Sequence, residues 1–571
     1  MKSTDNNLRT RFPTLVVLGF ILSFAKPSVG AIEPTRAEIL KGGLGPERTC
    51  YDVTSYHLDA RIDPATKSLK GSNKITFKTV EDFTKMQVDL WSNLPISKIV
   101  FDDQTPAAFT RELNAVFVEL PEKVQKKSSH SVTVYYSGVP TAARHPPWDG
   151  GISWDHDPDG NPWIVVTCPE TGASIWWPNK DHASDKPDNT TISITVPPEL
   201  DEISNGRLQA RTILPDGWVR YDWFVSYPIN NYCVTFNIGK YAHFSDEYVG
   251  QDGEPLTLDY YVLPKNLEKA KEHFKQVKTM LAVYEKYFGK YPFPRDGYKL
   301  VECPHTGMEH QSCIAYGNRY LGGFRGRSSS DVGLKFDFII IHESAHEWWG
   351  NSVTMKDIAD MWIHESFAAY AESLFVEDQY GRAEALKYIN GKKGNVRNEF
   401  PIISEYGLYR KSPADMYDKG QLILNTLRSV LDDDALWFSI LRGLQATFKY
   451  QNVSAEDIFG YVNRKSGKDL SYFFEQYFKR AQIPKLDLET QKEGDSVTVR
   501  YRWQADVGDF RMPVKVTTAP GKYEWITPTS EWQTNQLHGL NTEDFKVAED
   551  LFYVNVNSRR FYLDPQRKTT P

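Results

Sequence analysis

Apolar and polar residues alternate along the first third of the chain, in short segments separated by turn residues. The clearest segments are "SYHLDARID", "SNKITFKTV", "KMQVDLW", "AVFVEL", "HSVTVYYSG", "TTISITVPPEL" and "NYCVTFNIGKY". A period of two is typical of strands that bury one face. The pattern therefore predicts a β domain over residues 48–235, built as an antiparallel β-sandwich or a saddle of sheets.

The period changes near residue 265, where apolar residues begin to recur at helical spacing. The segment "NLEKAKEHFKQVKTMLAVYEKYFG" predicts one helix that ends at Gly289, and the strand "YKLVEC" follows it. Farther along, "SAEDIFGYVNRKSG" opens with a Ser-x-x-Asp capping signal, and "DLSYFFEQYFKRA" continues the helical pattern. Residues 236–483 are therefore predicted to form a mixed domain in which helices predominate.

Strand-like alternation returns after Pro484, in the segments "KLDLETQ", "SVTVRYRWQ", "MPVKVTT" and "LFYVNVN". Residues 484–571 are enough for one small β-sandwich. The pattern as a whole predicts a multidomain α+β protein. Its parts would be an N-terminal β domain, a mostly helical middle domain and a small C-terminal β-sandwich.

The N-terminus has the pattern of a secretory signal peptide. Three basic residues within the first eleven precede the apolar run "TLVVLGFILSFA", and small residues offer a cleavage site near 30/31. The run is short for a bilayer span, and an uncleaved membrane anchor is the alternative. We therefore expect residues 1–30 to be a signal peptide. The mature protein would be exported, periplasmic or extracellular, without stable membrane insertion.

Charge and cysteine content narrow the function classes. The formal net charge is −7, and it becomes −10 without residues 1–30, which carry +3. A negative chain without basic clusters argues against a nucleic-acid partner. The odd number of cysteines, none in C-x-x-C spacing, favours buried packing with one disulfide as an option. They are Cys50, Cys168, Cys233, Cys303 and Cys313.

The stretch "FDFIIIHESAHEWWGNSV" places ionisable residues in the pattern H-E-x-x-H inside an apolar segment. On a helix, His342 and His346 lie on one face and can bind one ion. Glu343 is rotated by about 100° from His342, so it can act as a general base beside the ion. A buried histidine is usually a core residue, but unpaired charges among these isoleucines would be costly.

A zinc site for hydrolysis needs a third protein ligand and an open position. The segment "DMWIHESFAAYAESLF" supplies Glu365, with eighteen residues between it and His346. Gly350–Asn351 can end the first helix, and the chain can then return so that a second, antiparallel helix presents Glu365. Nitrogen and oxygen ligands favour zinc over calcium or magnesium. We therefore expect one Zn²⁺ per chain, held by His342, His346 and Glu365.

The motifs "HESAHEWWGN" and "WIHESFAAY" together resemble those of the aminopeptidase N-like zinc metallopeptidases, peptidase family M1 of the gluzincin group. The family signature is H-E-x-x-H, eighteen residues, then E. The resemblance covers most of the mature chain and implies a thermolysin-like catalytic domain. The long helical C-terminal domain of many large relatives has no room here, so we expect a short form with a more open cleft.

The resemblance also implies substrate-binding residues. The segment "HTGMEHQSCIAYGN" matches the family marker Gly-x-Met-Glu-Asn through Met308 and Glu309, with Gly307 beside them. Glu309 would bind the free α-amine of a substrate, because a carboxylate there pairs favourably with a terminal ammonium. "TCPETGASIWWPNKD" resembles a second family loop, in which Glu170 matches another amine-binding carboxylate and Cys168 replaces the usual glutamine.

Two more positions follow from the resemblance. Tyr417 in "MYDKGQLILNTL" matches a tyrosine that donates to the oxyanion, with aspartate replacing glutamate after it. His364 and Ser366 flank Glu365 where the family commonly has asparagine and glycine. His364 is adjacent to a ligand, so we expect it to point elsewhere, behind the site or at the surface.

These observations predict a zinc aminopeptidase that removes N-terminal residues from peptides with a free N-terminus. Zinc would polarise the scissile carbonyl, Glu343 would take a proton from the attacking water, and Tyr417 would donate to the oxyanion. Alternatives are a zinc endopeptidase or epoxide hydrolase on the same scaffold, and a non-catalytic secreted binding protein. Nothing in the sequence indicates an oligomeric state.

Overall fold

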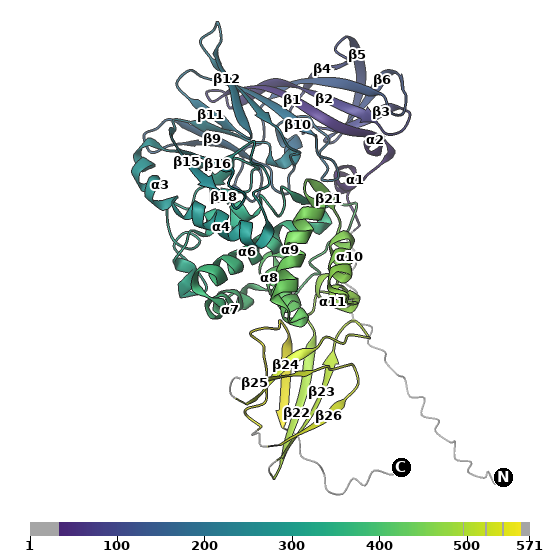
Figure 1. Ribbon diagram of the computed structural model, residues 1–571. Coiled ribbons are helices and arrows are strands. Elements are labelled where there is room, and N and C mark those ends of the chain that lie inside the picture. The colour runs from purple at the N-terminus through teal and green to yellow at the C-terminus, as the bar shows by residue number, and fades with distance from the viewer. Residues whose placement is uncertain (1–32, 411, 495, 520–521, 539–541, 561–571) are drawn as a thin grey trace, which may run out of the picture. The chain divides into compact units, whose positions relative to one another are not determined.

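The computed structural model describes residues 33–410, 412–494, 496–519, 522–538 and 542–560 (Figure 1). The predicted signal peptide, residues 1–30, lies outside this part of the chain. Within the described part, no helix is both long and apolar enough to cross a bilayer. All five cysteines are buried free thiols, as expected for packing residues, and no disulfide joins them.

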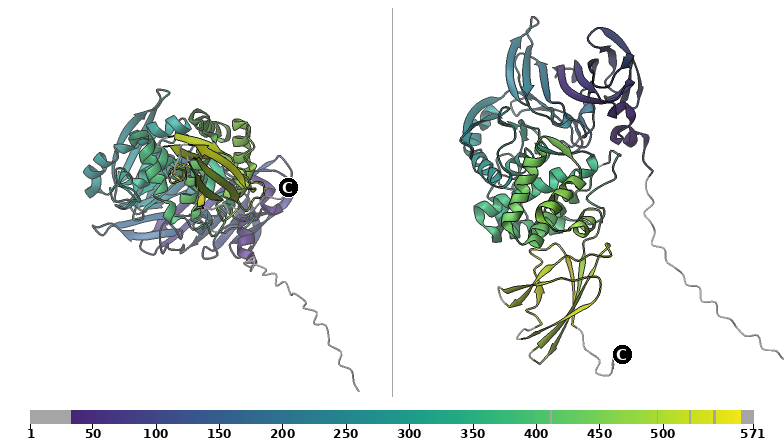
Figure 2. Two further views of the ribbon diagram at one scale, coloured as in Figure 1. Left: turned by 90° about the horizontal axis from the view of Figure 1, so that it is seen from below. Right: turned by 45° about the vertical axis from the view of Figure 1, so that its right-hand side comes forward.

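The predicted N-terminal strands form one large sheet and one small sheet. The large sheet has the order β12-β13-β10-β1-β2-β7-β4-β5-β6-β3, and the small sheet has the order β11-β14-β9-β8. Figure 2 shows these N-terminal strands, coloured purple to blue, in two further views. Every pairing in the large sheet is antiparallel except that of β1 with β10, which is parallel because a long crossover precedes β10. The bounds are β1 (Tyr51–Asp63), β2 (Ser68–Thr79), β3 (Phe83–Asp89), β4 (Ile96–Phe101), β5 (Thr105–Glu112), β6 (Ala115–Val124), β7 (Ser129–Gly138), β8 (Gly151–His156), β9 (Pro162–Thr167), β10 (Asn189–Val196), β11 (Asp201–Ser204), β12 (Arg207–Ile213), β13 (Val219–Val225) and β14 (Phe236–Gly239).

A five-stranded sheet follows and ends beside the predicted metal helix. Its order is β15-β16-β17-β19-β18, so β18 is an edge strand. This short strand consists of Gly307 and Met308, and it packs against helix α5. The residue that follows β18 is Glu309. The bounds are β15 (Ala242–Val249), β16 (Pro255–Val262), β17 (Tyr298–Glu302), β18 (Gly307–Met308) and β19 (Ile314–Tyr316).

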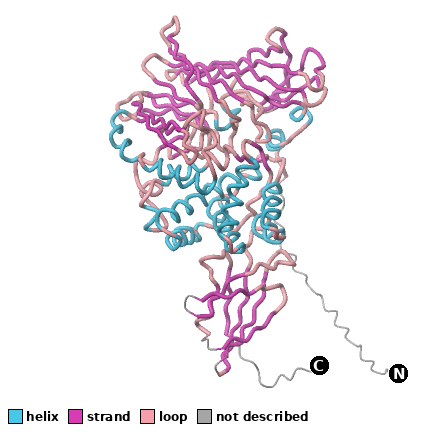
Figure 3. Tube along the Cα trace, in the orientation of Figure 1, coloured by secondary structure: helices cyan, strands magenta, loops and turns pink. Residues whose placement is uncertain are grey.

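Helices dominate the middle of the chain, as predicted (Figure 3). The capping signal at Ser454 forms a complete capping box with Asp457 at the start of α10. The single helix predicted before Gly289 is two helices, because backbone bonds near Phe274 change to a three-residue spacing. The bounds are α3 (Leu267–His273), α4 (Gln276–Phe288), α5 (Phe338–Ala345), α6 (Trp362–Tyr380), α7 (Arg382–Asn390), α8 (Asp415–Leu431), α9 (Asp434–Phe448), α10 (Ala455–Ser466) and α11 (Ser471–Phe478), with the strands β20 (Val353–Met355) and β21 (Gln451–Val453) among them.

The C-terminal strands form two small sheets, with the orders β26-β23-β22-β28 and β25-β24-β27. Their buried side chains belong to the same hydrophobic core as the helices. Tyr477 on α11 also donates to the Tyr553 carbonyl at 2.8 Å. The predicted multidomain α+β fold class is confirmed. The bounds are β22 (Lys485–Glu493), β23 (Ser496–Gln504), β24 (Val514–Ala519), β25 (Lys522–Ile526), β26 (Gln533–His538), β27 (Lys546–Val547) and β28 (Asn555–Arg560).

Glu202 on β11 is a buried carboxyl that has no ion-pair partner among the described residues. Its oxygens accept from the Ser204 hydroxyl at 2.6 Å and the Trp223 indole at 2.7 Å. Burial raises the pKa of Glu202 to about 8. The folded state therefore holds a proton that the unfolded state releases near its ordinary pKa of 4.5.

We predict that Glu202→Gln gains stability relative to the wild type as pH rises from about 5 to about 8. The wild type loses stability in this window, by up to about 1.4 kcal/mol per pH unit, because only the unfolded chain releases the proton readily. Denaturant unfolding at several pH values measures the difference, with Glu199→Gln, at an exposed position, as the control. If the difference in free energy of unfolding between Glu202→Gln and the wild type were the same at every pH, the prediction would be contradicted.

Candidate active site

The start of α5 is held by a buried aspartate. Asp337 is the N-cap residue, and its Oδ1 accepts from the amides of Ile339 at 2.9 Å and Ile340 at 3.2 Å. Its other oxygen, Oδ2, accepts from the Tyr316 hydroxyl and pairs with His273, both at 2.7 Å. The cap satisfies helix amides that would otherwise be unpaired, so the helix that carries the H-E-x-x-H motif begins at a fixed place.

α5 ends earlier than the sequence pattern predicted. We expected Gly350–Asn351 to end it, but the helix stops at Ala345. The amides of Glu347 and Trp348 each bond a carbonyl three residues earlier, which tightens the backbone into a turn. His346 is the helix C-cap and keeps helical backbone angles. Its side chain therefore still faces the same way as that of His342.

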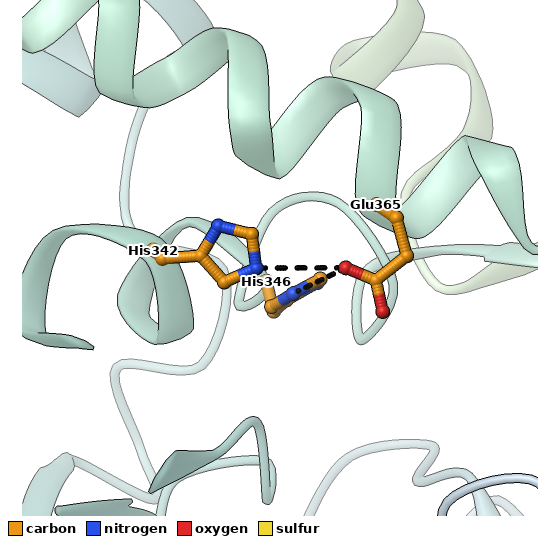
Figure 4. Close-up of side chains that lie close together, drawn as sticks. All are labelled: His342, His346 and Glu365. Atoms are coloured by element: carbon orange, nitrogen blue, oxygen red, sulfur yellow. Dashed lines mark ion pairs between the residues drawn. The ribbon is translucent and has the colours of Figure 1, made fainter. Parts of the chain in front are cut away.

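Two imidazole rings converge on one carboxylate (Figure 4). The Nε2 atoms of His342 and His346 lie 3.5 Å and 3.4 Å from the same Glu365 oxygen, Oε2. Glu365 lies in the first turn of α6, which packs against α5. All three side chains are buried. The structure therefore brings together the three residues that the motif spacing singled out as ligands.

The opposite nitrogen of each ring is anchored by an acceptor. His342 Nδ1 donates to Glu372 at 2.7 Å, and His346 Nδ1 donates to the Trp349 carbonyl at 2.9 Å. Because these partners can only accept, each Nδ1 carries a proton. A neutral ring then has its lone pair on Nε2, which is the atom that faces Glu365.

Glu372 is itself held from its far side. Its second oxygen, Oε2, accepts from the Tyr388 hydroxyl and the Lys392 ammonium, both at 2.6 Å. Burial alone would raise the pKa of Glu372, but Lys392 and His342 outweigh it and the pKa lies below its ordinary value. A carboxylate that orients a histidine in this way is the usual support of a metal-binding imidazole.

The donor set fits one zinc ion. Two imidazole Nε2 atoms and one carboxylate oxygen lie within 4.8 Å of one another, which is the composition of a catalytic zinc site that keeps a position free. A second group with the same spacing shares His346 and adds Glu309 and Glu343. In that second group only one donor is an imidazole, so the first group is the better match to zinc.

Glu343, a member of the second group, is buried, and no hydrogen bond to its carboxylate is seen within the described part of the chain. Burial raises the pKa of Glu343 above its ordinary range. A Cβ added to Gly307 would lie 2.8 Å from its Oε1 and 2.8 Å from Ile339 Cγ2. Edge strand β18 therefore approaches α5 so closely that a side chain at position 307 would displace Glu343 or Ile339.

Tyr417 extends from α8, and its hydroxyl donates to Glu365 Oε1 at 2.9 Å. α8 lies close to α6 at Gly420. A Cβ on Gly420 would lie 2.0 Å from the Ser366 hydroxyl oxygen, so a larger residue would clash there. That hydroxyl donates to the Met416 carbonyl at 2.7 Å. The serine that departs from the family pattern thus links the two helices that carry Glu365 and Tyr417.

The residues expected to bind an amine lie along the same cleft. Glu309 is buried, and its Oε1 accepts from the Tyr232 hydroxyl at 3.0 Å. Met308, Gly307 and Glu170 also line the cleft, which has a cavity volume of about 200 Å³. Glu170 is partly buried and has a left-handed backbone, with φ of 56°. It lies in the loop after β9, beside Pro169.

His364 lies behind the site rather than at the surface. It is fully buried, and its Nε2 accepts from the Met355 amide at 3.0 Å. Its Nδ1 lies 3.3 Å from the Tyr232 hydroxyl. Burial lowers the pKa of His364 to about 3, so the ring is neutral.

Four residues that shape the site were not predicted from the sequence. Glu372 had a usable signal, because it lies seven residues after Glu365 and so on the same face of α6. No sequence signal pointed to the other three, Tyr232, Trp148 and Lys392, because each reaches the site only through the tertiary fold. Trp148 and Lys392 both line the cleft, and the Trp148 side chain is 56% exposed.

Comparisons with known proteins agree with this geometry. A model described as the peptidase family M1 domain matches residues 272–477, and the peptidase M1 N-terminal domain matches residues 52–233. The chain belongs to peptidase family M1. The resemblance stated from the motifs is thereby confirmed for both the strand-rich N-terminal part and the helical part.

Individual relatives within family M1 are distant. Endoplasmic reticulum aminopeptidase 1 from Mus musculus is 26% identical over 345 residues, 58% of this chain and 36% of that protein. Human glutamyl aminopeptidase is 30% identical over 188 residues, 33% of this chain and 19% of that protein. The chain spans about a third of the length of the first of these curated M1 relatives.

A solved structure supports the fold. The M1 zinc metallopeptidase from Deinococcus radiodurans superposes with a TM-score of 0.63 at 20% identity. The match covers 76% of this chain and 94% of that one. The two proteins therefore share the M1 fold over most of their lengths.

We predict that Glu372→Gln weakens zinc binding by about tenfold to a hundredfold, because His342 loses the carboxylate that orients its ring. Competition with a chromogenic chelator measures the affinity. Glu377→Gln, on the same helix but paired with Arg428, is the matched control and should bind zinc as the wild type does. Equal affinities for the wild type and Glu372→Gln would show that the carboxylate does not support the site.

Proposed function

We propose that this protein is a zinc aminopeptidase that removes residues from the free N-terminus of peptides. One observation carries the proposal: the Glu309 carboxylate lies within 4.8 Å of the donor atoms of Glu343 and His346. In a peptide, about 2.5 Å separates the terminal nitrogen from the first carbonyl carbon. A terminal ammonium held by Glu309 therefore leaves room for only the first peptide bond beside the metal donors.

The proposed chemistry uses one zinc ion and five side chains. When bound by His342, His346 and Glu365, zinc would supply Lewis-acid polarisation of the carbonyl and lower the pKa of a water. Glu343 accepts a proton from the water as the water oxygen attacks the carbonyl carbon. As the C–N bond breaks, Glu343 returns the proton to the leaving nitrogen. Tyr417 moves its hydroxyl from Glu365 to the oxyanion and stabilises the developing charge.

The amine-binding carboxylates restrict the substrate. Glu309 pairs with the terminal ammonium through a charge-assisted hydrogen bond, and Glu170, which lines the same cleft, contributes a second carboxylate. An internal peptide segment would leave Glu309 buried without a cation, which is unfavourable. This argues against an endopeptidase on the same scaffold. Among the described residues that line the cleft, none specifically favours an epoxide substrate.

A non-catalytic binding protein is also disfavoured. A buried pair of oriented imidazoles, a third carboxylate and an adjacent unbonded glutamate are costly to maintain without a metal and a reaction. The names of the curated relatives, which are aminopeptidases, support the same choice.

The test compares an aminoacyl anilide with the same anilide acetylated at its amine. We predict that Glu309→Gln lowers kcat/KM for the free-amine substrate by about a hundredfold, because the charge that pairs with the ammonium is lost. The rate on the acetylated substrate should stay unchanged. Glu343→Gln should retain zinc and cleave neither substrate, which controls for a contaminating protease. An unchanged ratio of the two rates in Glu309→Gln would refute the amine-binding role.

A further inference from the structure

A chain of hydrogen bonds runs from the protein backbone to the amine-binding carboxylate. Its members are the Met355 amide, His364, Tyr232 and Glu309, at successive distances of 3.0, 3.3 and 3.0 Å. Met355 ends β20, His364 lies in α6, and Tyr232 belongs to the short 3-10 helix Asn231–Cys233. The chain therefore joins three segments behind the cleft.

The direction of every bond in this chain is determined by chemistry. The Met355 amide can only donate, so His364 Nε2 carries no proton and accepts. The neutral ring then carries its proton on Nδ1, which donates to the Tyr232 oxygen. A phenol has one hydrogen, and Glu309 Oε1 is the acceptor left for it. Each group donates toward Glu309.

Packing fixes the histidine ring in place. His364 has no exposed surface. Gly350 approaches it closely, since a Cβ there would lie 3.2 Å from both Cγ and Nδ1 of the ring. The ring also stacks near Tyr232, with planes inclined by 22°. A side chain confined in this way can hold a hydrogen-bond partner in one orientation.

The restraint matters because Glu309 has competing partners. Its carboxylate lies within 4.8 Å of the ligand atoms of Glu343 and His346. Without a donor on Oε1, the carboxylate could rotate toward His346 and leave the amine site. With Oε1 held by Tyr232, Oε2 stays available for a substrate.

We propose that His364 and Tyr232 are positioning residues that align Glu309 for the terminal ammonium and so set the selectivity for a free N-terminus. This inference rests on the proposed function and deepens it. His364 acts only through Tyr232, and neither residue touches the reacting atoms. Removing either should therefore impair recognition of the amine more than the chemical step.

The experiment uses full-length enzyme loaded with zinc and the same pair of free and acetylated anilides. Tyr232→Phe deletes one hydroxyl. It should raise KM for the free-amine substrate by about tenfold, with kcat changed by less than about threefold. His364→Ala should have the same effect. His364→Asn should restore most of the selectivity, because its amide nitrogen can occupy the place of Nδ1.

Two further measurements separate positioning from general damage. Zinc affinity by chelator competition should match the wild type in all variants, although His364 is adjacent to Glu365. The double variant Tyr232→Phe/His364→Ala should be no worse than either single variant, because both changes break one chain.

The outcomes are distinct. If the wild-type enzyme fails to cleave the free-amine substrate, the proposed function is overturned, and so is the positioning role of His364 and Tyr232. If the wild type is active and Tyr232→Phe has the same selectivity, only the positioning role of His364 and Tyr232 is overturned. The positioning role would also be overturned by additive effects in the double variant or by loss of zinc from His364→Ala. In either case His364 would act by another route.

Discussion

The site depends on one arrangement: two imidazole Nε2 atoms meet a single carboxylate oxygen inside the protein. Such a cluster is unfavourable unless each ring is held in one tautomer and one orientation. Glu372 and the Trp349 carbonyl provide that restraint for His342 and His346. The early end of α5 is part of the same arrangement, because the turn after Ala345 brings the Trp349 carbonyl within reach of His346.

The surrounding fold supplies the rest of the cleft from distant parts of the chain. Edge strand β18 approaches α5 through Gly307 and presents Glu309 at its end. α6 and α8 are drawn together at Gly420, which places Tyr417 against Glu365. The N-terminal strand-rich part adds Tyr232, which bonds Glu309, and Glu170, which lines the cleft. The cleft is therefore lined by residues from both regions that match family M1.

Much of this was predictable from local patterns. The placement of His342 and His346 on one face follows from helical spacing and the capping box at Ser454 from a four-residue signal, because both depend on neighbours in sequence. The end of α5 was predicted wrongly, since glycine is only a statistical stop signal and the turn there forms earlier. His364 shows the other limit. Its burial and its bond to Tyr232 depend on contacts 132 residues apart, which no local pattern encodes.

The most direct test of the account is anomalous X-ray diffraction at the zinc absorption edge, on crystals of the protein as purified. The account predicts one anomalous peak, at about 2.0–2.2 Å from His342 Nε2, His346 Nε2 and a Glu365 oxygen. A peak centred instead on Glu309, Glu343 and His346, or zinc-loaded crystals in which the three predicted ligands point apart, would contradict it.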